Sequence, residues 1–191
     1  MEIILASGSP RRKQLLAELG LKFEVNPTDI DESVPSNISA HKVALYLAQK
    51  KGAAARDQWG KSACILAADS VVILNSKILG KPKNRSEAIN MILALSGKNH
   101  QVHTGFHLQY QQQEIAQKVV SNVFMDTISQ KEAEFYVDNY QPYDKAGSYA
   151  IQEWIGHCKV RKIEGSYTNI VGLPTHQVYR AFRKIKGPNN T

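Results

Sequence analysis

The hydrophobic and polar positions along the chain follow two periods, one typical of helices and one typical of strands. Residues 2–6 are a short apolar run that predicts a first strand, and leucines then recur at helical spacing over residues 10–19. Ser9 before this helix, Pro10 at its first position and Gly20 after it are residue types typical of helix boundaries. The chain is therefore expected to begin with a strand, a loop of small residues and a helix.

The same two periods predict the elements of the remaining chain. A long hairpin is expected where apolar residues alternate with mostly polar ones from Val102 to Tyr110 and the chain returns over residues 115–128. Ser129 and Glu132 have the spacing of a capping box, which predicts the start of a helix. The other expectations are strands at 22–26, 64–74 (interrupted at Asp69 and Ser70), 148–151 and 158–163; helices from Ser39 to about Ala55, from Ser86 to Ser96, from Ser129 to about Asn139 and from Pro174 onwards; a loop at 27–38; and a frayed tail at 187–191.

This order of elements predicts a mixed α/β fold. A β-α-β start followed by antiparallel strands favours a mixed sheet over a purely parallel, doubly wound one. The 191 residues contain no internal repeat and no linker-like run, so we expect one domain over residues 1–191. With 42% hydrophobic and 21% charged residues, the composition excludes a disordered chain or a coiled coil. Neither a dinucleotide-binding glycine motif nor a Walker phosphate loop occurs.

Composition also bears on partners and location. The 24 Lys and Arg residues against 17 Asp and Glu residues give a net charge of +7, which fits either a polyanionic partner or a basic surface that only aids solubility. Cys64 and Cys158 have no paired spacing, which favours a reducing compartment and argues against a thiolate zinc site. The apolar runs are too short to cross a membrane, and the acid at Glu2 makes a poor secretory signal. We therefore expect a soluble cytoplasmic protein with no membrane partner.

Residues 7–13, with the sequence Ser-Gly-Ser-Pro-Arg-Arg-Lys, combine a small-residue loop, a helix start and three cations. The N–H groups at a helix N-terminus attract anions, and the side chains of Arg11 and Arg12 could grip a phosphate. Because cations in a first helical turn are unfavourable beside the helix dipole, we favour an anion-binding cradle here. The alternative is an ordinary Ser-Pro helix cap with solvated basic side chains.

Carboxylates form the second group of candidates. Asp69 lies inside an apolar run, where a carboxylate needs compensation by a metal, a cation or several donors, and such groups gather at functional sites. The alternative is an Asp that caps a turn at the end of a strand. Glu32, beside Asp29 and Asp31 in a loop, is either a solvated acid or a ligand. If Glu32 meets Asp69, two carboxylates plus phosphate oxygens suit a hard cation such as Mg²⁺.

Lysines and one amide complete the candidates. Lys81, in a stiff Gly-Lys-Pro turn, is a candidate for binding phosphate, whereas Lys51 is expected to end a helix and pair with the helix dipole. Lys145 either binds phosphate or pairs with Asp144. Gln152 could read the hydrogen-bonding edge of a base, or it could be a satisfied amide at the end of a strand.

Several of these motifs together resemble the Maf family of nucleotide pyrophosphatases. The most specific parts are residues 5–12, Leu-Ala-Ser-Gly-Ser-Pro-Arg-Arg, and residues 143–152, Tyr-Asp-Lys-Ala-Gly-Ser-Tyr-Ala-Ile-Gln. Further stretches match in order and at the spacing of the family, namely residues 31–33, 68–72, 80–82, 96–98 and 165–174. The resemblance covers nearly the whole chain.

This resemblance implies a fold, an activity and a set of site residues. The fold would be an elongated mixed β-sheet with flanking helices and a cleft between two lobes, similar to inosine-triphosphate pyrophosphatases. The activity would be hydrolysis of a nucleoside triphosphate to the monophosphate and pyrophosphate with a divalent cation, Mg²⁺ or Mn²⁺. Asp69 would accept a proton from water and would bind the metal together with Glu32. The triphosphate would be held by Ser7, Arg12, Lys51 and Lys81, and Lys81 would also belong to the catalytic residues.

The resemblance further implies a substrate preference. Arg11, the hydroxyl residue Ser70 and Gln152 match the branch of the family that prefers dTTP and UTP, and these three residues would select the base. Glu153 replaces the usual Gly of the family and adds a charge beside the base pocket. Removal of non-standard nucleotides would be a related role of such an enzyme.

The prediction also includes two alternative functions and an oligomeric state. A sister branch prefers 7-methylguanosine triphosphate, and its pattern differs at all three base-selecting positions. A nucleic-acid-binding regulator of septum formation would explain the positive charge, but the aromatic residues do not interleave with the basic ones as stacking on nucleic acid requires. No stable nucleic-acid partner is therefore expected, and the family suggests a homodimer.

Overall fold

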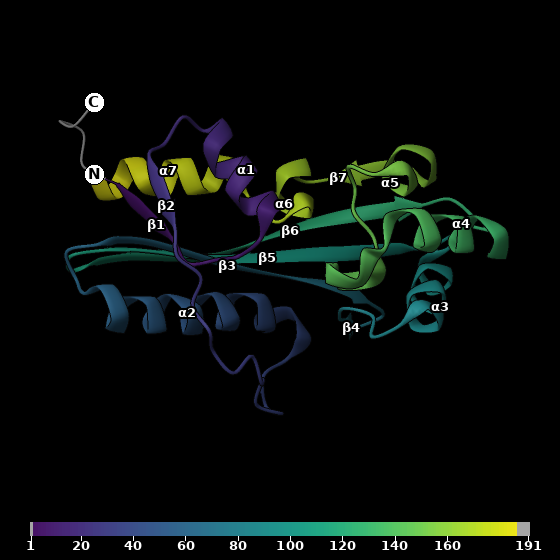
Figure 1. Ribbon diagram of the computed structural model, residues 1–191, viewed down its shortest axis with the longest axis horizontal. Helices are drawn as coiled ribbons and strands as arrows, with labels where there is room; N and C mark the ends of the chain where they lie inside the picture. Colours follow the sequence, from purple (N-terminus) through teal and green to yellow (C-terminus); the bar gives the residue numbers. More distant parts are fainter. Residues whose placement is uncertain (1, 187–191) are drawn as a thin grey trace. The chain divides into compact units, whose positions relative to one another are not determined.

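The computed structural model describes residues 2–186 and shows a mixed α/β fold (Figure 1). The strands pair in the order β2-β1-β3-β5-β6-β7, and β4 pairs with β3. Their bounds are β1 Ile3–Leu5, β2 Phe23–Val25, β3 Cys64–Leu74, β4 Lys77–Leu79, β5 Asn99–Tyr110, β6 Gln113–Met125 and β7 Val160–Glu164. Strand β1 is parallel to both β2 and β3, whereas β4 and β7 are antiparallel to their neighbours. The predicted mixed sheet is therefore confirmed.

Seven α-helices and two short 3₁₀ segments accompany these strands in the described part of the chain. The helices are α1 Pro10–Glu18, α2 Ala40–Trp59, α3 Arg85–Leu95, α4 Gln130–Tyr140, α5 Trp154–Lys159, α6 Tyr167–Val171 and α7 Thr175–Lys186. The 3₁₀ segments are η1 Pro142–Asp144 and η2 Ala146–Ser148. Within residues 2–186, no helix is both long and apolar enough for a bilayer crossing.

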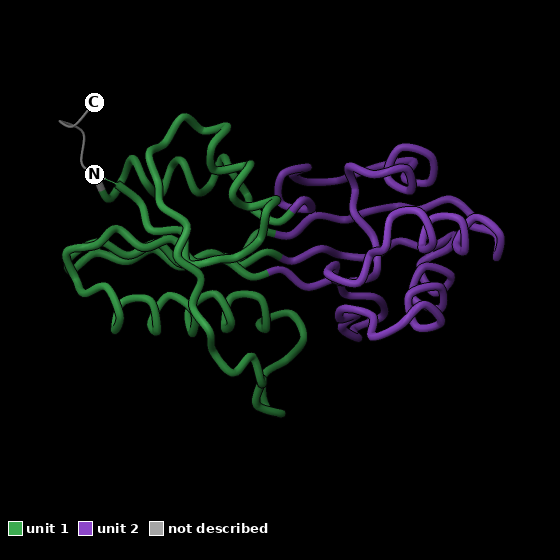
Figure 2. Tube along the Cα trace, viewed as in Figure 1, with its two compact units in different colours: residues 1–69, 104–119, 172–191 green, residues 70–103, 120–171 purple. Residues whose placement is uncertain are grey.

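The chain divides into two compact units, each built from separate stretches of sequence (Figure 2). Unit 1 consists of Met1–Asp69, Thr104–Val119 and Gly172–Thr191, and unit 2 consists of Ser70–His103 and Val120–Val171. The boundary within β3 falls directly after Asp69. The two units are described separately below.

In unit 1, helices cover both faces of the strands. Helix α2 lies on one side, and α1 and α7 lie on the other (Figure 1). Small residues allow close packing, because Ala6, Ala55 and Ala67 form a buried cluster with Ile65. Strand β5 approaches α2 closely at Gly105, where a Cβ atom would lie 2.5 Å from the carbonyl oxygen of Ala44. This contact fixes the position of α2 against its strand.

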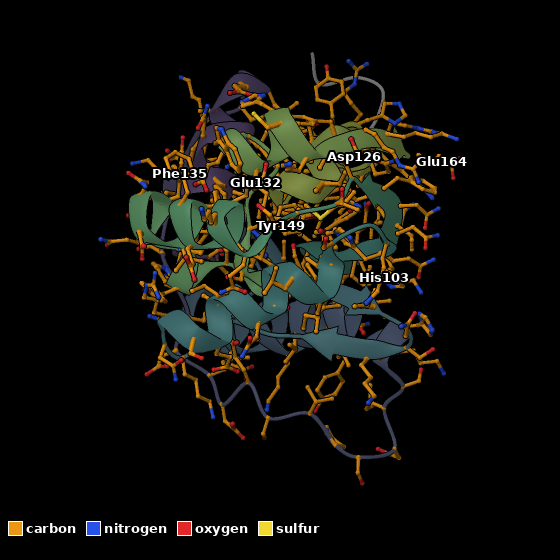
Figure 3. The ribbon with its side chains drawn as sticks, turned by 90° about the vertical axis from the view of Figure 1, so that its right-hand side faces the viewer. His103, Asp126, Glu132, Phe135, Tyr149 and Glu164 are labelled. Carbon is orange, nitrogen blue, oxygen red and sulfur yellow. The ribbon has the colours of Figure 1, made fainter. Side chains whose placement is uncertain are left out.

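In unit 2, helices α3 and α4 pack on each other and on the adjoining strands. Tyr136 of α4 is fully buried, and Tyr149 is buried with its hydroxyl 2.7 Å from His100 Nε2. Burial lowers the pKa of His100 to about 4, so this imidazole is neutral at ordinary pH. Figure 3 shows Tyr149 and His103, together with Phe135 on the outer side of α4. The core of unit 2 therefore joins α3, α4 and the strands into one hydrophobic cluster.

Several boundary predictions are confirmed by their cap contacts. The Ser9 side chain accepts a hydrogen bond from the Arg12 backbone N–H, and Pro10 begins α1. Ser129 and Glu132 form the predicted capping box at the start of α4. Residues 187–191, where a frayed tail is predicted, lie outside the described residues.

Other predictions are wrong for identifiable reasons. Strand β3 runs without interruption through Asp69 and Ser70, because Asp69 is compensated by a cation and needs no turn. Residues 148–151 form no strand, since Gly147 and Ser148 both have positive φ angles, 69° and 62°, which turn the chain. Helix α2 continues to Trp59 because alanines prolong it, and the short elements β4, α5 and α6 carry too little periodicity to be predicted.

Glu132 gives unit 2 a pH-dependent contact at the start of α4 (Figure 3). A hydrogen bond from Lys159, whose Nζ lies 2.5 Å from Glu132 Oε1, together with bonds from Ser129, lowers the pKa of Glu132 from 4.5 to about 2. As the pH falls below 4.5, the unfolded chain takes up the proton first, so this contribution to stability is lost between pH 4.5 and about 2.

We expect Glu132→Gln to be less stable than the wild type at neutral pH, by about 1 kcal/mol once the solvent exposure of this pair is considered. The difference should disappear near pH 2, in urea unfolding followed by circular dichroism. A difference that stays constant from pH 7 to 2 would contradict the assignment of the contact to the ionised form.

Candidate active site

Ser7 and Arg12 are held together at the start of α1. The Arg12 Nη1 donates a hydrogen bond to Ser7 Oγ at 3.0 Å, and Arg12 Nε donates to the carbonyl oxygen of Gly172 at 2.9 Å. Ser7 is buried and Arg12 is half-buried. Ser9 caps the helix as the cap alternative expects, and Arg12 is fixed in one orientation beside the cap, whereas the anion-binding cradle stays a prediction.

Lys51 bridges the two carboxylates that the sequence singles out. Its Nζ lies 2.6 Å from Asp69 Oδ1 and 2.7 Å from Glu32 Oε1. The side chains of Lys51 and Asp69 are each only 12% exposed, so solvent screens this contact little. The prediction that Lys51 ends a helix is wrong, because Lys51 lies in the middle of α2. Its ammonium points toward Asp69 of β3.

The loop that carries Glu32 is attached to α2 next to Lys51. Lys50 Nζ donates a hydrogen bond to the backbone carbonyl of Asp31, and it lies 3.9 Å from the Asp31 carboxylate. The Asp31 carboxylate in turn accepts bonds from the side chain and backbone N–H of Ser33, which lower its pKa. Consecutive lysines of one helix therefore have different tasks, since Lys50 holds the loop and Lys51 contacts the carboxylates.

Arg12 belongs electrostatically to the same cluster. Burial lowers the pKa of its guanidinium, and the neighbouring Arg11 acts in the same direction, whereas the negative charges of Asp69 and Glu32 raise it. Two carboxylates thus face two cations, Arg12 and Lys51, within unit 1. Such a balanced cluster can exchange its internal ion pairs for contacts with an anionic ligand and a metal ion.

The carboxylates of Glu32 and Asp69 could supply two of the ligands of a hard divalent cation. Both carboxylates already contact one cation, the Lys51 ammonium, so they converge on one position. Among the described residues, no group of three His, Cys, Asp or Glu side chains could hold a metal. The protein therefore offers two oxygen donors, a number typical of Mg²⁺ sites in which phosphate oxygens and water complete the coordination.

The structure brings together only part of the predicted site. Ser7, Arg11, Arg12, Glu32, Lys51 and Asp69 all belong to unit 1. The predicted residues Ser70, Lys81 and Gln152 belong to unit 2, where Lys81 is exposed and Ser70 is half-buried. The Gln152 Oε1 is buried and, in residues 2–186, has no hydrogen-bond partner. The roles of these three residues stay predictions.

A network around Glu153 was not predicted from the sequence. Its carboxylate accepts a hydrogen bond from the Tyr136 hydroxyl and lies 3.5 Å from Lys145 Nζ. The same hydroxyl accepts a bond from the Ala150 N–H at 3.0 Å. Lys145 also pairs with Asp144 at 2.9 Å, which supports the pairing alternative for this lysine. Glu153 could be noticed in the sequence because it replaces the usual Gly of the family. Its partner Tyr136 lies in α4, and the sequence gives no sign of this contact.

The Ser7 hydroxyl is expected to contribute measurably to stability. Ser7→Ala removes the acceptor of the Arg12 Nη1 bond, and a hydrogen bond to a charged group is worth about 1.5–3 kcal/mol. Ser9→Ala is the matched comparison, since it removes a helix cap and should cost only about 1 kcal/mol. Urea unfolding of both variants tests this order. A smaller loss for Ser7→Ala than for Ser9→Ala would contradict it.

Comparison with known families decides where this chain belongs. Residues 2–185 match the family described as Maf-like protein. The chain belongs to this family. A dTTP/UTP pyrophosphatase of Bacteroides thetaiotaomicron is 42% identical to this Maf-like protein over 185 residues, which cover 96% of each chain. A dTTP/UTP pyrophosphatase of Porphyromonas gingivalis is 43% identical over 191 residues, which cover 98% of this chain and 96% of the relative.

A solved structure supports the fold of this Maf-like protein. The Staphylococcus aureus Ham1 protein matches with a TM-score of 0.50 at 13% identity, over 98% of this chain and 100% of that chain. At such low identity the similarity concerns the fold alone. The predicted family and the mixed α/β class are therefore confirmed, whereas the elongated outline and the cleft between two lobes stay predictions.

Proposed function

We propose that this Maf-like protein hydrolyses dTTP and UTP to the monophosphate and pyrophosphate. The observation that carries the proposal is the cluster of Asp69, Glu32, Lys51 and Arg12 in unit 1, which combines two carboxylates with two cations. Its support is the name dTTP/UTP pyrophosphatase, which relatives at about 42% identity carry over nearly the whole chain. The cluster offers both kinds of group that phosphoanhydride hydrolysis needs, a base and a set of anion-binding donors.

The proposed cofactor is Mg²⁺ or Mn²⁺, held by Glu32 and Asp69. When bound, such an ion supplies charge neutralisation of the phosphate oxygens and lowers the pKa of an attacking water. The protein would contribute one carboxylate each from Glu32 and Asp69 to hold the ion.

The side chains of unit 1 have separate tasks in the proposed reaction. Asp69 Oδ orients the water and accepts its proton as the water attacks the α-phosphorus. The donors of Arg12, held in orientation by Ser7, and the Lys51 ammonium bind the triphosphate and stabilise pyrophosphate as it leaves. Lys81 of unit 2 is proposed to add a further cation to the phosphates.

The base preference is proposed to come from Arg11, Ser70 and Gln152. The buried and unpartnered Oε1 of Gln152, among residues 2–186, supports a contact with a base N–H. Since a polar site left without its partner loses binding energy, such a pocket rejects bases with the wrong hydrogen-bonding edge. Removal of non-standard nucleotides, a single domain over residues 1–191, a homodimer and a cytoplasmic location likewise remain proposals.

A nucleotide panel tests the proposed function. The purified full chain is incubated with dTTP, UTP, dCTP, GTP and 7-methylguanosine triphosphate, with Mn²⁺ or Mg²⁺ and separately with EDTA, and pyrophosphate and phosphate are measured. We expect metal-dependent release of pyrophosphate from dTTP and UTP. Preferred turnover of 7-methylguanosine triphosphate would contradict the proposed substrates. DNA binding without any hydrolysis would contradict the proposed enzymatic function and favour a nucleic-acid-binding module.

A further inference from the structure

We propose that Lys51 is an internal counter-ion that occupies the position of the divalent cation until a triphosphate withdraws it, so that metal and nucleotide bind together. The inference concerns the order of binding and rests on the proposed function. It assigns Lys51 a second task in addition to phosphate binding, namely to keep the carboxylate pair from taking up a metal in the absence of substrate.

The Lys51 ammonium lies where a metal ion would need to bind. Lys51 Nζ lies 2.6 Å from Asp69 and 2.7 Å from Glu32, so it already forms close contacts with an oxygen of each carboxylate. A Mg²⁺ or Mn²⁺ ion takes oxygen ligands at about 2.0–2.2 Å and would need the same carboxylates. Ammonium and ion therefore compete for one position.

The charge of the cluster makes this competition strong. The two carboxylates are balanced by Lys51 and Arg12, and a divalent ion added without removal of Lys51 would place like charges side by side. The contact between Lys51 and Asp69 is largely shielded from solvent, so this repulsion is weakly screened. Since the described residues supply no third acidic or histidine ligand, no further negative charge there offsets an ion that enters while Lys51 stays in place.

Lys51 is the cation of the cluster that can change its position. Asp69 lies within the continuous strand β3, and Arg12 is fixed by Ser7 and by the carbonyl oxygen of Gly172. Lys51 reaches the carboxylates from α2 through a flexible four-carbon chain. A triphosphate offers phosphate oxygens to the Lys51 ammonium, which then leaves the two carboxylates. Other phosphate oxygens can bind, together with these carboxylates, to a divalent ion. Binding of metal and triphosphate is therefore mutually reinforcing, and by thermodynamic linkage each raises the affinity of the other equally.

The test measures Mn²⁺ binding to the full chain without nucleotide, by electron paramagnetic resonance of the free ion. We expect Lys51→Met to bind Mn²⁺ at least about tenfold more tightly than the wild type, because the competing cation is gone. The matched control is Lys42→Met, which removes an exposed positive charge from the same helix, and it should bind Mn²⁺ like the wild type. Addition of a non-hydrolysable dUTP analogue should raise the Mn²⁺ affinity of the wild type by at least about tenfold, and that of Lys51→Met by clearly less.

Two outcomes overturn the inference. One is equal or weaker Mn²⁺ binding by Lys51→Met, and the other is a wild-type Mn²⁺ affinity that the nucleotide analogue leaves unchanged. If Lys51→Met does not fold, Lys51→Gln replaces it in the Mn²⁺ measurement. The effect of the dUTP analogue on the Mn²⁺ affinity of the wild type tests the inference without any variant. Failure of the proposed function looks different, since dTTP and UTP would then remain intact in the nucleotide panel whatever the Mn²⁺ affinity. Either of the two outcomes together with active hydrolysis of dTTP would reject the counter-ion role alone.

Discussion

Asp69→Asn should lower the rate of pyrophosphate release from dTTP by roughly 10²–10⁴-fold, the usual contribution of a general base. The carboxamide keeps the size of the side chain, and its oxygen can still accept a hydrogen bond from Lys51. It cannot accept a proton from water, and it is a weaker ligand for a divalent ion. We therefore expect the loss in kcat, measured with saturating Mn²⁺ and dTTP, while the melting temperature changes little.

The control for lost charge is Asp57→Asn, which removes an exposed carboxylate from the same unit at the far end of α2. This variant should hydrolyse dTTP at the wild-type rate. Comparable rates for Asp69→Asn and the wild type would remove Asp69 from the chemical step. A large loss in both variants would instead indicate that the net charge of unit 1 matters more than any single carboxylate.

Gly105→Ala should destabilise the protein by about 3 kcal/mol, at the upper end of what overpacking costs. The added methyl group would lie 2.5 Å from the Ala44 carbonyl oxygen and 2.5 Å from Leu45 Cα, and both atoms belong to the backbone of α2. A helix backbone cannot rotate away as a side chain can, so α2 must shift from its strand. Since Lys50 and Lys51 lie on α2, a loss of activity should accompany the loss of stability.

Gly80→Ala is the comparison for the same chemical change in a different environment. A Cβ atom at this position would meet nothing within 4 Å, and the φ angle of Gly80 is an ordinary negative one. Its stability should stay within about 0.5 kcal/mol of the wild type. Urea midpoints of the two variants test the difference, and equal midpoints would show that α2 yields to the extra methyl without cost.

Local signals in the sequence predicted the parts of the fold that depend on local contacts. Ser9 with Pro10, and Ser129 with Glu132, correctly located two helix starts because a cap bonds to residues only three positions away. The alternating pattern correctly predicted a strand at β5, but its predicted half-burial is wrong, because polar side chains such as His103 and His107 are buried as well. The family motifs pointed correctly to a mixed α/β fold, which the pairing of the strands confirms.

Long-range pairing explains what the sequence did not reveal. Asp69 was expected to interrupt its strand, because nothing in the neighbouring residues indicates that Lys51, eighteen positions earlier, neutralises it. Lys51 was expected at a helix end for the same reason, since nothing in the neighbouring residues indicates its contacts with Asp69 and Glu32. The Glu153 carboxylate was visible as a departure from the family, but its bond to the Tyr136 hydroxyl required the fold of α4.

The hydrogen bond from Arg12 to the Gly172 carbonyl joins residues 160 positions apart. A nascent chain emerges from the ribosome N-terminus first, so Arg12 is synthesised long before its acceptor. Unit 1 also needs the strand segment 104–119 and helix α7, which are both synthesised after α1. Arg12 therefore reaches its final orientation only after Gly172 has been synthesised, and a product that ends before Gly172 would carry the motif of residues 7–13 without the contact that orients Arg12.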